Sequence, residues 1–534
     1  MATGDEHKAS SFASRDKAYY VTTPIYYVND APHIGHAYTT TAGDVLTRWH
    51  RQRGEQVHFL TGTDEHGEKV LQAAQQRGLT VQEWTDEMVR TGWQPMLETM
   101  DIANDDFIRT TQERHTARVQ DFLRLLRDNG DVYEGTYTGP YCVSCEEFKN
   151  PSELVDGRFC PVDGREVQEL SEANYFFRLS AYADRLLAHY REHPGFVEPE
   201  SRRNEVVRFV EGGLQDISLS RSTFDWGVPV PWDPRHVVYV WIDALQNYIT
   251  AVGWGADEAE FARTWPADVH LVGKDILRFH AVIWPAMLMS AGIELPRKVF
   301  AHGWLLVGGE KMSKSKLTGI PPQQLTDTFG SDALRYYFLR EIQFGQDGNF
   351  SWESLRARYT SELANDFGNL ASRVTSMVTR YRESLLPEPG EEAPADKALQ
   401  SGLAEAARVA DERIRALDFA TGIGAVMDYV KQVNGYVSEQ QPWALAKDDA
   451  QAGRLDTVLY CAAEALRGIA VLLHPVMPRS TQVLWSALGA DGMLGVIGDQ
   501  RVQEAGDWGQ LQAGMHVTKC PALFPRVEEE APAT

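Results

Sequence analysis

The chain has 534 residues, of which 43% are hydrophobic and 24% are charged, and its formal net charge is -23. This length and apolar content predict a folded protein of several domains, and the acidic balance excludes a protein that binds nucleic acid through its mean charge. Five cysteines do not make a disulfide framework, and we find no signal peptide and no apolar run of membrane-spanning length, so we expect a cytoplasmic protein without a membrane partner.

The first predicted unit is a strand, a loop and a helix. Residues 19–23 form a β-rich run, and apolar residues at helical spacing follow Gly35 until Gly54. His33 and His36 bracket Gly35 at the start of this helix, where N–H groups and the macrodipole attract phosphate. The two imidazoles can donate to phosphate oxygens as negative charge builds in a transition state, and Gly35 lets a ligand lie against the backbone. Two ordinary loop histidines are the alternative on these residues alone.

A second strand is predicted at 57–61, followed by another amphipathic helix. Two such units favour a doubly wound parallel sheet, whose ligand lies at the carboxyl ends of the strands. Asp64 lies at such an end, where its carboxylate can hold a substrate ammonium or simply cap the next helix. We expect the sheet to resume at 237–241 and 269–273. The turn that follows, Gly273-Lys274-Asp275, offers N–H groups and a carboxylate suited to a ribose.

Two rows of side chains follow these later strands. Such rows usually belong to a core. A histidine and several large aromatic residues near strand ends also suit a pocket for a flexible thioether, because sulfur packs well against aromatic rings. One row is Trp241, Ala244, Leu245 and Tyr248, and the other is Ile276, His280 and Trp284 at a spacing of four residues.

Residues 131–233 interrupt the alternation of strands and helices and are predicted to form an inserted domain. Within it, Cys142-x2-Cys145 and, fourteen residues later, Cys160-x2-Asp163 have the spacing of two knuckles closing on one Zn²⁺. A fourth Cys or His would be commoner than Asp163, so a knuckle that has lost its metal is the alternative. A bound ion would be structural, because all the candidate ligands come from the protein.

The segment 300–317 carries lysines, among them Lys311 and Lys314, beside the flexible Gly308-Gly309. A glycine-hinged loop with lysines suits triphosphate chemistry, since its cations can close over charge that develops in the transition state. A solvated basic loop is the alternative. Beyond Trp352 the pattern changes to long amphipathic helices, which predict a helix bundle. We expect these helices at 352–381, 396–418, 420–438 and 451–473, with a shorter one after Ser480.

The predicted fold class is α/β, with a Rossmann-type doubly wound parallel sheet, an inserted zinc-knuckle domain and a following all-α helix-bundle domain. The two halves of the Rossmann domain are placed at 1–130 and 234–298, and the insertion at 131–233. A linking domain is predicted at 299–351, the helical domain at 352–526 and a disordered tail at 527–534.

HIGH at 33–36 and KMSKS at 311–315 match the two signatures of class I aminoacyl-tRNA synthetases, and the pair is far more specific than either half. PIYY before HIGH, TGTDEHG, WIDALQNY, GKDILRFHAVIWPAM, NLASR and QPW resemble the bacterial methionyl-tRNA synthetase family in particular. The resemblance runs from about Tyr19 to Arg526.

The resemblance implies an ATP-dependent ligase that forms methionyl-adenylate and pyrophosphate, then transfers the methionyl group to the terminal ribose of tRNA. Its implied partners are methionine and both initiator and elongator tRNA(Met), with Mg²⁺ accompanying ATP. The motifs assign catalysis to His33, His36, Lys311 and Lys314, and ATP binding to Gly35, Gly273, Lys274, Asp275 and Lys314. They assign methionine binding to Ile25, Tyr27, Asp64, Trp241, Ala244, Leu245, Tyr248, Ile276, His280 and Trp284. They assign anticodon binding to Asn365, Asn369, Arg373, Pro442 and Trp443.

Two features depart from the family pattern. Asp163 stands where the family usually has Cys or His, which puts the affinity for zinc in doubt more than the function. No tRNA-binding extension follows Arg526, so we expect a monomer.

Two other functions fit the sequence less well. Leucine, isoleucine and valine enzymes of this class carry a larger editing insertion than residues 131–233 can hold, and a cysteine enzyme needs a metal in its amino-acid pocket. A non-catalytic RNA-binding derivative would have no use for both signature motifs.

Overall fold

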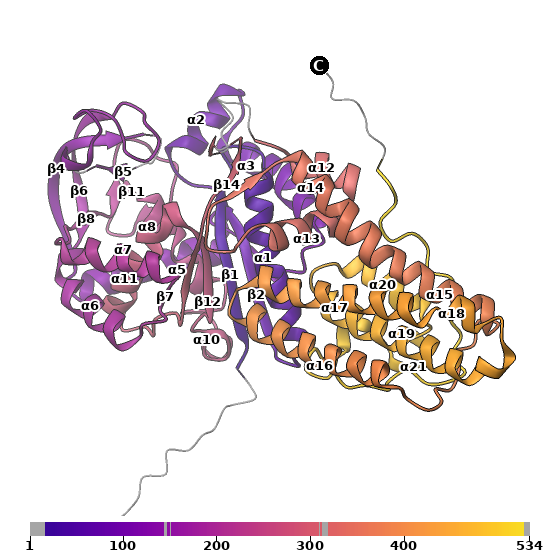
Figure 1. Ribbon diagram of the computed structural model, residues 1–534. Helices are drawn as coiled ribbons and strands as arrows, with labels where there is room; N and C mark the ends of the chain where they lie inside the picture. The colour runs from indigo at the N-terminus through magenta and orange to yellow at the C-terminus, as the bar shows by residue number, and fades with distance from the viewer. Residues whose placement is uncertain (1–16, 144–146, 150, 309, 312–318, 528–534) are drawn as a thin grey trace, which may run out of the picture.

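The computed structural model describes residues 17–143, 147–149, 151–308, 310–311 and 319–527. Its centre is a six-stranded parallel sheet in the order β3-β2-β1-β12-β13-β7, with the inserted elements on one side and the helical domain on the other (Figure 1). The strand order reverses between β1 and β12, which are neighbours, and ligands of such sheets bind at this switch point. The strands are β1 (Tyr19–Tyr27), β2 (Val57–Asp64), β3 (Asp106–Arg109), β7 (Val197–Glu198), β12 (Val269–Gly273) and β13 (Val299–His302).

Helix α1 (Ile34–Gln52) follows β1 and begins with an unusual cap. His33 has extended backbone, and its Nδ1 accepts a hydrogen bond from the Gly35 N–H at 3.1 Å. The His33 N–H donates in turn to His36 Nδ1 at 3.2 Å. The first N–H groups of a helix have no hydrogen-bond partner within the helix, and a Ser or Asp oxygen usually accepts from them. Here histidine ring nitrogens accept these hydrogen bonds instead.

The inserted region is built on a long antiparallel pairing of β4 (Val132–Cys142) with β6 (Gln168–Phe177). In the chain, β4 directly follows helix α5 (Glu113–Asp128). The sheet that contains this pairing has the order β5-β4-β6-β8. Part of the predicted insertion returns to the central sheet, because Val197 of β7 pairs with Val299 of β13. Its remaining elements are β5 (Glu147–Phe148), α6 (Ala183–Glu192), α7 (Glu200–Glu211) and β8 (Ile217–Ser218).

The expectation that 237–241 continues the parallel sheet is wrong. Residues Asp233–Val238 form β11, which pairs antiparallel with β9 (Ser220–Arg221) and β10 (Pro229–Val230) in a separate three-stranded sheet. Val240 already begins helix α8 (Val240–Ala244). A run of valine and tyrosine suits any half-buried strand, and local sequence does not say which sheet the strand joins.

The helix bundle follows a small linking sheet of β14 (Leu305–Val307), β15 (Glu310–Lys311) and β16 (Gly348–Phe350). The predicted bundle helices are present, and the first one contains a π-helical turn, η7 (Tyr359–Gly368), between α14 (Trp352–Arg358) and α15 (Asn369–Tyr381). The others are α16 (Pro394–Arg415), α17 (Phe419–Gln440), α19 (Ala452–Leu473) and α20 (Pro478–Ala487).

The shorter helices connect these units. In the part of the chain that the structure describes, no helix is both long and apolar enough to span a bilayer. The predicted fold class is confirmed, while the domain boundaries stay a prediction. The connecting helices are α2 (Glu68–Gln76), α3 (Val81–Met88), α4 (Gln94–Thr99), α9 (Asn247–Thr250), α10 (Glu258–Thr264), α11 (Trp284–Ala291), α12 (Pro322–Phe329), α13 (Ser331–Glu341), α18 (Pro442–Leu445) and α21 (Asp491–Leu494).

A buried arginine joins the central-sheet part of the molecule to the helical domain. The side chain of Arg335, on α13, is fully buried and donates to Asp44 Oδ2 of α1 at 2.6 Å. It also donates to the carbonyls of Met100 at 3.0 Å, Pro475 at 2.8 Å and Val476 at 2.8 Å. Burial alone would raise the pKa of Asp44, but Arg335 and Arg48 outweigh it and hold the pKa below its ordinary value.

We predict that Asp44→Asn lowers the free energy of unfolding by about 3 kcal/mol at pH 7, because it leaves the Arg335 charge buried without its counter-ion. Urea denaturation measures this loss. Since folding lowers the pKa of Asp44, its contribution is complete above the ordinary value of 3.8 and is lost as the pH falls through the folded value. The control Arg114→Gln breaks the exposed pair with Asp106 and should cost at most about 1 kcal/mol. Equal losses in the two variants would contradict the role given to Arg335.

Candidate active site

Four strand ends and one helix start meet at the switch point of the central sheet. β1 and β2 end side by side, with Tyr27 opposite Asp64, and β12 and β13 end with Gly273 opposite His302. Helix α1 begins at Ile34, with His33 as its cap, directly after the loop that follows β1 (Figure 1). The structure therefore brings to one edge the segments on which the predicted ATP and methionine residues lie.

The His33 and His36 rings stack with their centroids 3.9 Å apart. The Nδ1 atom of each ring accepts a backbone hydrogen bond, so in the neutral form each ring carries its proton on Nε2. Burial, with His33 nearby, lowers the pKa of His36 well below its ordinary value. Tyr26 and Trp93 pack edge-on against His36, each with a centroid distance of 5.0 Å. The first turn of α1 thus presents neutral Nε2–H donors.

The other side of this edge is tied to α1 by His302. The His302 Nδ1–H donates to the Gly303 carbonyl at 2.8 Å, so its Nε2 accepts from the Thr39 hydroxyl at 2.8 Å. Lys274 forms an ion pair with Asp347 at 2.7 Å, and its Nζ lies 4.0 Å from the Trp304 ring centroid.

Gly273 permits a close approach in the turn after β12. A Cβ at this position would lie 2.6 Å from Asp275 Oδ1, closer than van der Waals contact allows. The glycine therefore lets the Asp275 carboxylate fold back over the end of the strand.

An aromatic wall lies beside the ends of β1 and β12. The Trp241 ring stacks on Phe279 with centroids 3.9 Å apart, and the Tyr248 hydroxyl lies 2.8 Å from His280 Nε2. Because His280 Nδ1 is 3.0 Å from the Ile276 carbonyl and must donate to it, Nε2 accepts from Tyr248. Burial lowers the pKa of His280 to about 4, so this ring is neutral near pH 7.

The apolar residues predicted to bind methionine differ in their burial. Trp284 packs behind Tyr248 with a centroid distance of 6.3 Å, in the core rather than at its surface. A π-helical turn, η5 (Phe279–Ile283), separates His280 from Trp284 and changes the helical phase between them. The partly exposed residues at the edge of this core are Ile25, Tyr27, Trp241 and Ile276, while Ala244, Leu245 and Trp284 are fully buried in it.

Three of the four predicted zinc ligands lie together at the tip of the β4–β6 ladder. Cys142 and Cys160 are buried, and Cys142 Sγ lies 3.6 and 3.8 Å from the carboxylate oxygens of Asp163. The three ligand atoms lie within 4.8 Å of one another. Around a tetrahedral Zn²⁺ with bonds of about 2.0–2.3 Å, ligand atoms stand roughly 3.3–3.8 Å apart, so these residues fit the ion.

Three predicted residues are not placed with the site. Cys145 and Lys314 lie outside the described residues, and Lys311 is described only by its backbone, opposite Leu306 in the linking sheet. Their roles stay predictions.

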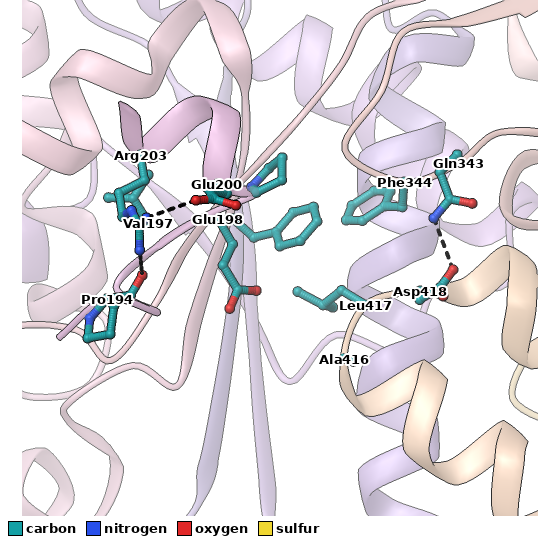
Figure 2. Close-up of a pocket in the computed structure, with 12 residues that line it drawn as sticks. Pro194, Val197, Glu198, Glu200, Arg203, Gln343, Phe344, Ala416, Leu417 and Asp418 are labelled. Carbon is teal, nitrogen blue, oxygen red and sulfur yellow. Dashed lines mark hydrogen bonds and ion pairs between the residues drawn. The ribbon is translucent and has the colours of Figure 1, made fainter. Parts of the chain in front are cut away.

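A cavity of about 530 Å³ lies away from the strand ends, between the β7 edge of the sheet and the loop after α16 (Figure 2). Its walls include Glu198 on one side and Leu417 on the other, and Gln343 donates to Asp418 at 3.0 Å on the same side as Leu417. No predicted site residue lines it, so it is a gap between two parts of the molecule and not part of the active site.

Comparison with known proteins shows the family. A family model for "tRNA synthetases class I (M)" matches residues 19–169 and 150–375, and a model for the "Anticodon binding domain of methionyl tRNA ligase" matches residues 386–534. The methionine–tRNA ligase of Streptomyces coelicolor is 62% identical over 542 residues, covering 100% of both chains. That of Thermotoga maritima is 46% identical over 96% of this chain and 80% of its own.

Solved structures show the same likeness. The Mycobacterium tuberculosis methionyl-tRNA synthetase in complex with methionyl-adenylate has a TM-score of 0.91 and 44% identity, covering 96% of this chain and 100% of its own. Its apo form has a TM-score of 0.84 and 42% identity, covering 96% and 99%. The chain belongs to the methionyl-tRNA synthetase family. The predicted family and enzyme class are confirmed.

In this member of the methionyl-tRNA synthetase family, the predicted anticodon residues lie on the outer part of the helical domain. Asn365 and Asn369 are exposed along η7 and α15, and Arg373 donates to Asn434 of α17 at 3.0 Å. Burial lowers the pKa of Arg373. Pro442 is buried at the start of α18, while Trp443 beside it is 40% exposed and so does not pack as a core residue.

Several residues near the site were not predicted from the sequence. Phe279 was missed because fourfold spacing from Ile276 skips it, whereas the π-helical turn places its ring on Trp241. His302 is the last residue of β13, and Asp347 lies in the GQDG turn directly before β16. The position of His302 at the end of a strand is the signal that identified Asp64, whereas no such signal marks Asp347.

We predict two opposite tautomers among the site histidines at pH 7. Nitrogen-15 NMR should find the proton on Nε2 in His33 and His36 and on Nδ1 in His280 and His302, with each resonance assigned by its loss in a His→Gln variant. His280 should begin to titrate only near pH 4. Because its folded pKa lies below the ordinary 6.5, the stability from burying it is complete above 6.5 and declines as the pH falls toward 4. A doubly protonated His280 at pH 6 would contradict the hydrogen bonds described here.

Proposed function

We propose that the chain attaches methionine to tRNA in two steps, with ATP as the source of energy. A carboxylate oxygen of methionine attacks the α-phosphorus of ATP, the bond to the bridging oxygen breaks, and pyrophosphate leaves. A hydroxyl of the terminal tRNA ribose then attacks the carbonyl carbon of methionyl-adenylate, loses its proton, and AMP leaves. The observation that carries the proposal is that neutral imidazole donors and a buried aromatic wall meet at one switch point.

The start of α1 binds the phosphate groups of ATP. The Nε2–H groups of His33 and His36 donate to phosphate oxygens as charge builds on them, and Gly35 gives the nucleotide room beside the backbone. Lys311 and Lys314 add positive charge, and ATP enters with Mg²⁺. Gly273, Lys274 and Asp275 hold the ribose and adenine side of ATP. Lys274 must exchange its Asp347 partner if it contacts the nucleotide directly.

The aromatic wall and Asp64 bind methionine. The Asp64 carboxylate, buried at the end of β2, binds the ammonium group. Trp241, Tyr248 and His280, with the other predicted residues of the wall, enclose the thioether, which packs against ring edges. Neutral His280, held by Tyr248 and the Ile276 carbonyl, makes the pocket polar at one point without placing a charge beside the apolar side chain.

The helical domain selects the tRNA, and both initiator and elongator tRNA(Met) are substrates. Exposed Asn365 and Asn369 read base edges, Arg373 adds a charged donor, and Trp443 offers a ring for an unstacked base. Such local contacts do not require a basic protein, which reconciles RNA binding with the net charge of -23.

One Zn²⁺ held by Cys142, Cys145, Cys160 and Asp163 would stabilise the tip of the inserted region. With all positions filled by protein ligands, the ion would serve structure and not catalysis. A monomeric state and a cytoplasmic location stay predictions from the sequence.

Pyrophosphate–ATP exchange with each of the twenty amino acids tests the proposal. Methionine alone should support strong exchange, and comparable turnover of leucine or isoleucine would refute the pocket assignment.

Tyr248→Phe leaves His280 Nε2 buried without its donor and should raise the methionine KM about tenfold. The matched control Tyr436→Phe removes a buried tyrosine hydroxyl from the helical domain, where it bonds Asp396, and should leave this KM unchanged.

Trp443→Ala tests tRNA selection. It should reduce aminoacylation kcat/KM at least ~10-fold, the lower end of the roughly 1–3 kcal/mol that one base stack contributes. Methionine-dependent exchange and the thermal midpoint should stay nearly unchanged, since the ring is half exposed and adenylate forms in the other domain. The control Trp352→Ala alters another tryptophan that is 37% exposed and should not weaken tRNA selectively. A lower melting temperature with equal losses in both reactions would mean that Trp443 stabilises the fold instead.

Metal analysis tests the zinc site. We expect one zinc per chain, lost in Cys142→Ala, and Asp163→Cys should tighten its binding because thiolate is the softer ligand. Purified wild-type protein without zinc, and as stable as Cys142→Ala, would favour a knuckle that has lost its metal.

A further inference from the structure

The carboxylate of Asp243 lies buried between two histidines, next to the aromatic wall but without a role in the proposed chemistry. Its Oδ2 accepts from His66 Nδ1 at 2.6 Å and its Oδ1 from His115 Nε2 at 2.9 Å. The side chains of Asp243 and His115 have no exposed surface, and that of His66 is 7% exposed. Burial alone would raise the pKa of Asp243, but His66 and His115 outweigh it and lower the pKa to about 2, so the group is an anion.

Each partner of this carboxylate belongs to a segment that carries proposed methionine residues. His66 follows Asp64 by two residues in the loop after β2, and Asp243 follows Trp241 by two residues on α8. The second nitrogen of His115, Nδ1, lies 2.8 Å from the Thr250 hydroxyl on α9, the helix that carries Tyr248. One buried anion thus ties three segments of the pocket to α5.

These segments cannot hold their positions alone. α8 has five residues and α9 has four, which is too short for a helix to be stable without tertiary contacts. The loop after β2 reaches Gly67, whose φ of 102° only glycine adopts readily. Charge-assisted hydrogen bonds are short and directional, so Asp243 can fix these segments relative to one another.

A tryptophan holds His66 from the other side. The Trp226 Nε1–H donates to the Glu65 carbonyl at 2.6 Å, and its ring lies edge-on to His66 with centroids 5.7 Å apart. Contacts on both sides therefore hold His66 in place, so the position of Asp243 constrains the nearby strand end at Asp64.

We propose that Asp243 is a positioning residue that sets the spacing between Asp64 and the wall formed by Trp241 and Tyr248, and thereby determines the affinity for methionine. This inference rests on the proposed function. A purely structural role would instead lower stability or all kinetic constants together.

The two histidines donate through different nitrogens, which gives a selective test. The amide nitrogen of asparagine can replace Nδ1, and that of glutamine can replace Nε2. In pyrophosphate exchange, His66→Asn and His115→Gln should keep the methionine KM near wild type. His66→Gln, His115→Asn and Asp243→Asn should raise it about tenfold, because they leave a buried partner unpaired, while the KM for ATP stays unchanged.

The matched control is His50, which donates through Nδ1 to Glu55 Oε2 at 2.6 Å at the opposite end of α1. Neither His50→Asn nor His50→Gln should change the methionine KM. Equal effects of Asn and Gln at both His66 and His115, or losses confined to the thermal midpoint, would overturn the positioning role while wild-type exchange still supported the proposed function. Absence of methionine-dependent exchange in the wild type would overturn both.

Discussion

The buried pair between Arg335 and Asp44 fixes how the two large parts of the molecule are joined. Asp44 lies in the middle of α1, whose first turn carries His33 and His36. Arg335 also donates to the Pro475 and Val476 carbonyls at the turn before α20, within the helical domain. The helix that carries the His33 and His36 rings at its start is therefore also the helix on which the bundle is docked. A movement of the bundle acts on α1 directly, without an intervening loop.

The far end of α1 strengthens this arrangement. Trp49 Nε1 donates to Asp411 of α16 at 3.0 Å, and Arg53 reaches the same carboxylate at 2.5 Å. On the opposite side of the sheet, the cavity beside β7 leaves the two parts less closely packed (Figure 2). The junction between the two parts is therefore closely bonded along α1 and open along the β7 edge.

Features that depend on neighbouring residues could be predicted from the sequence, and features that depend on residues far apart in the chain could not. The strand at 269–273 and the start of α1 depend on local pattern and turn residues, and the signature motifs identify the family because both halves occur together. The sheet joined by 233–238, the stacking of Phe279 on Trp241 and the pair of Asp44 with Arg335 depend on partners distant in sequence or on a π-helical turn. No local period encodes such features, so they required the structure.

The inserted region keeps its proposed metal ligands apart from its contacts with the candidate active site. At its tip, Asp163 replaces the softer ligand that would bind zinc most tightly. At its base, the long pairing of β4 with β6 and the bond from Trp226 to the Glu65 carbonyl hold the region against the active-site loop without any metal. Weaker binding at the proposed zinc site would therefore loosen the knuckle and leave the loop that carries Asp64 and His66 in place. The chain can depart from the family pattern at Asp163 for this reason, whereas a change at Trp226 would reach the site directly.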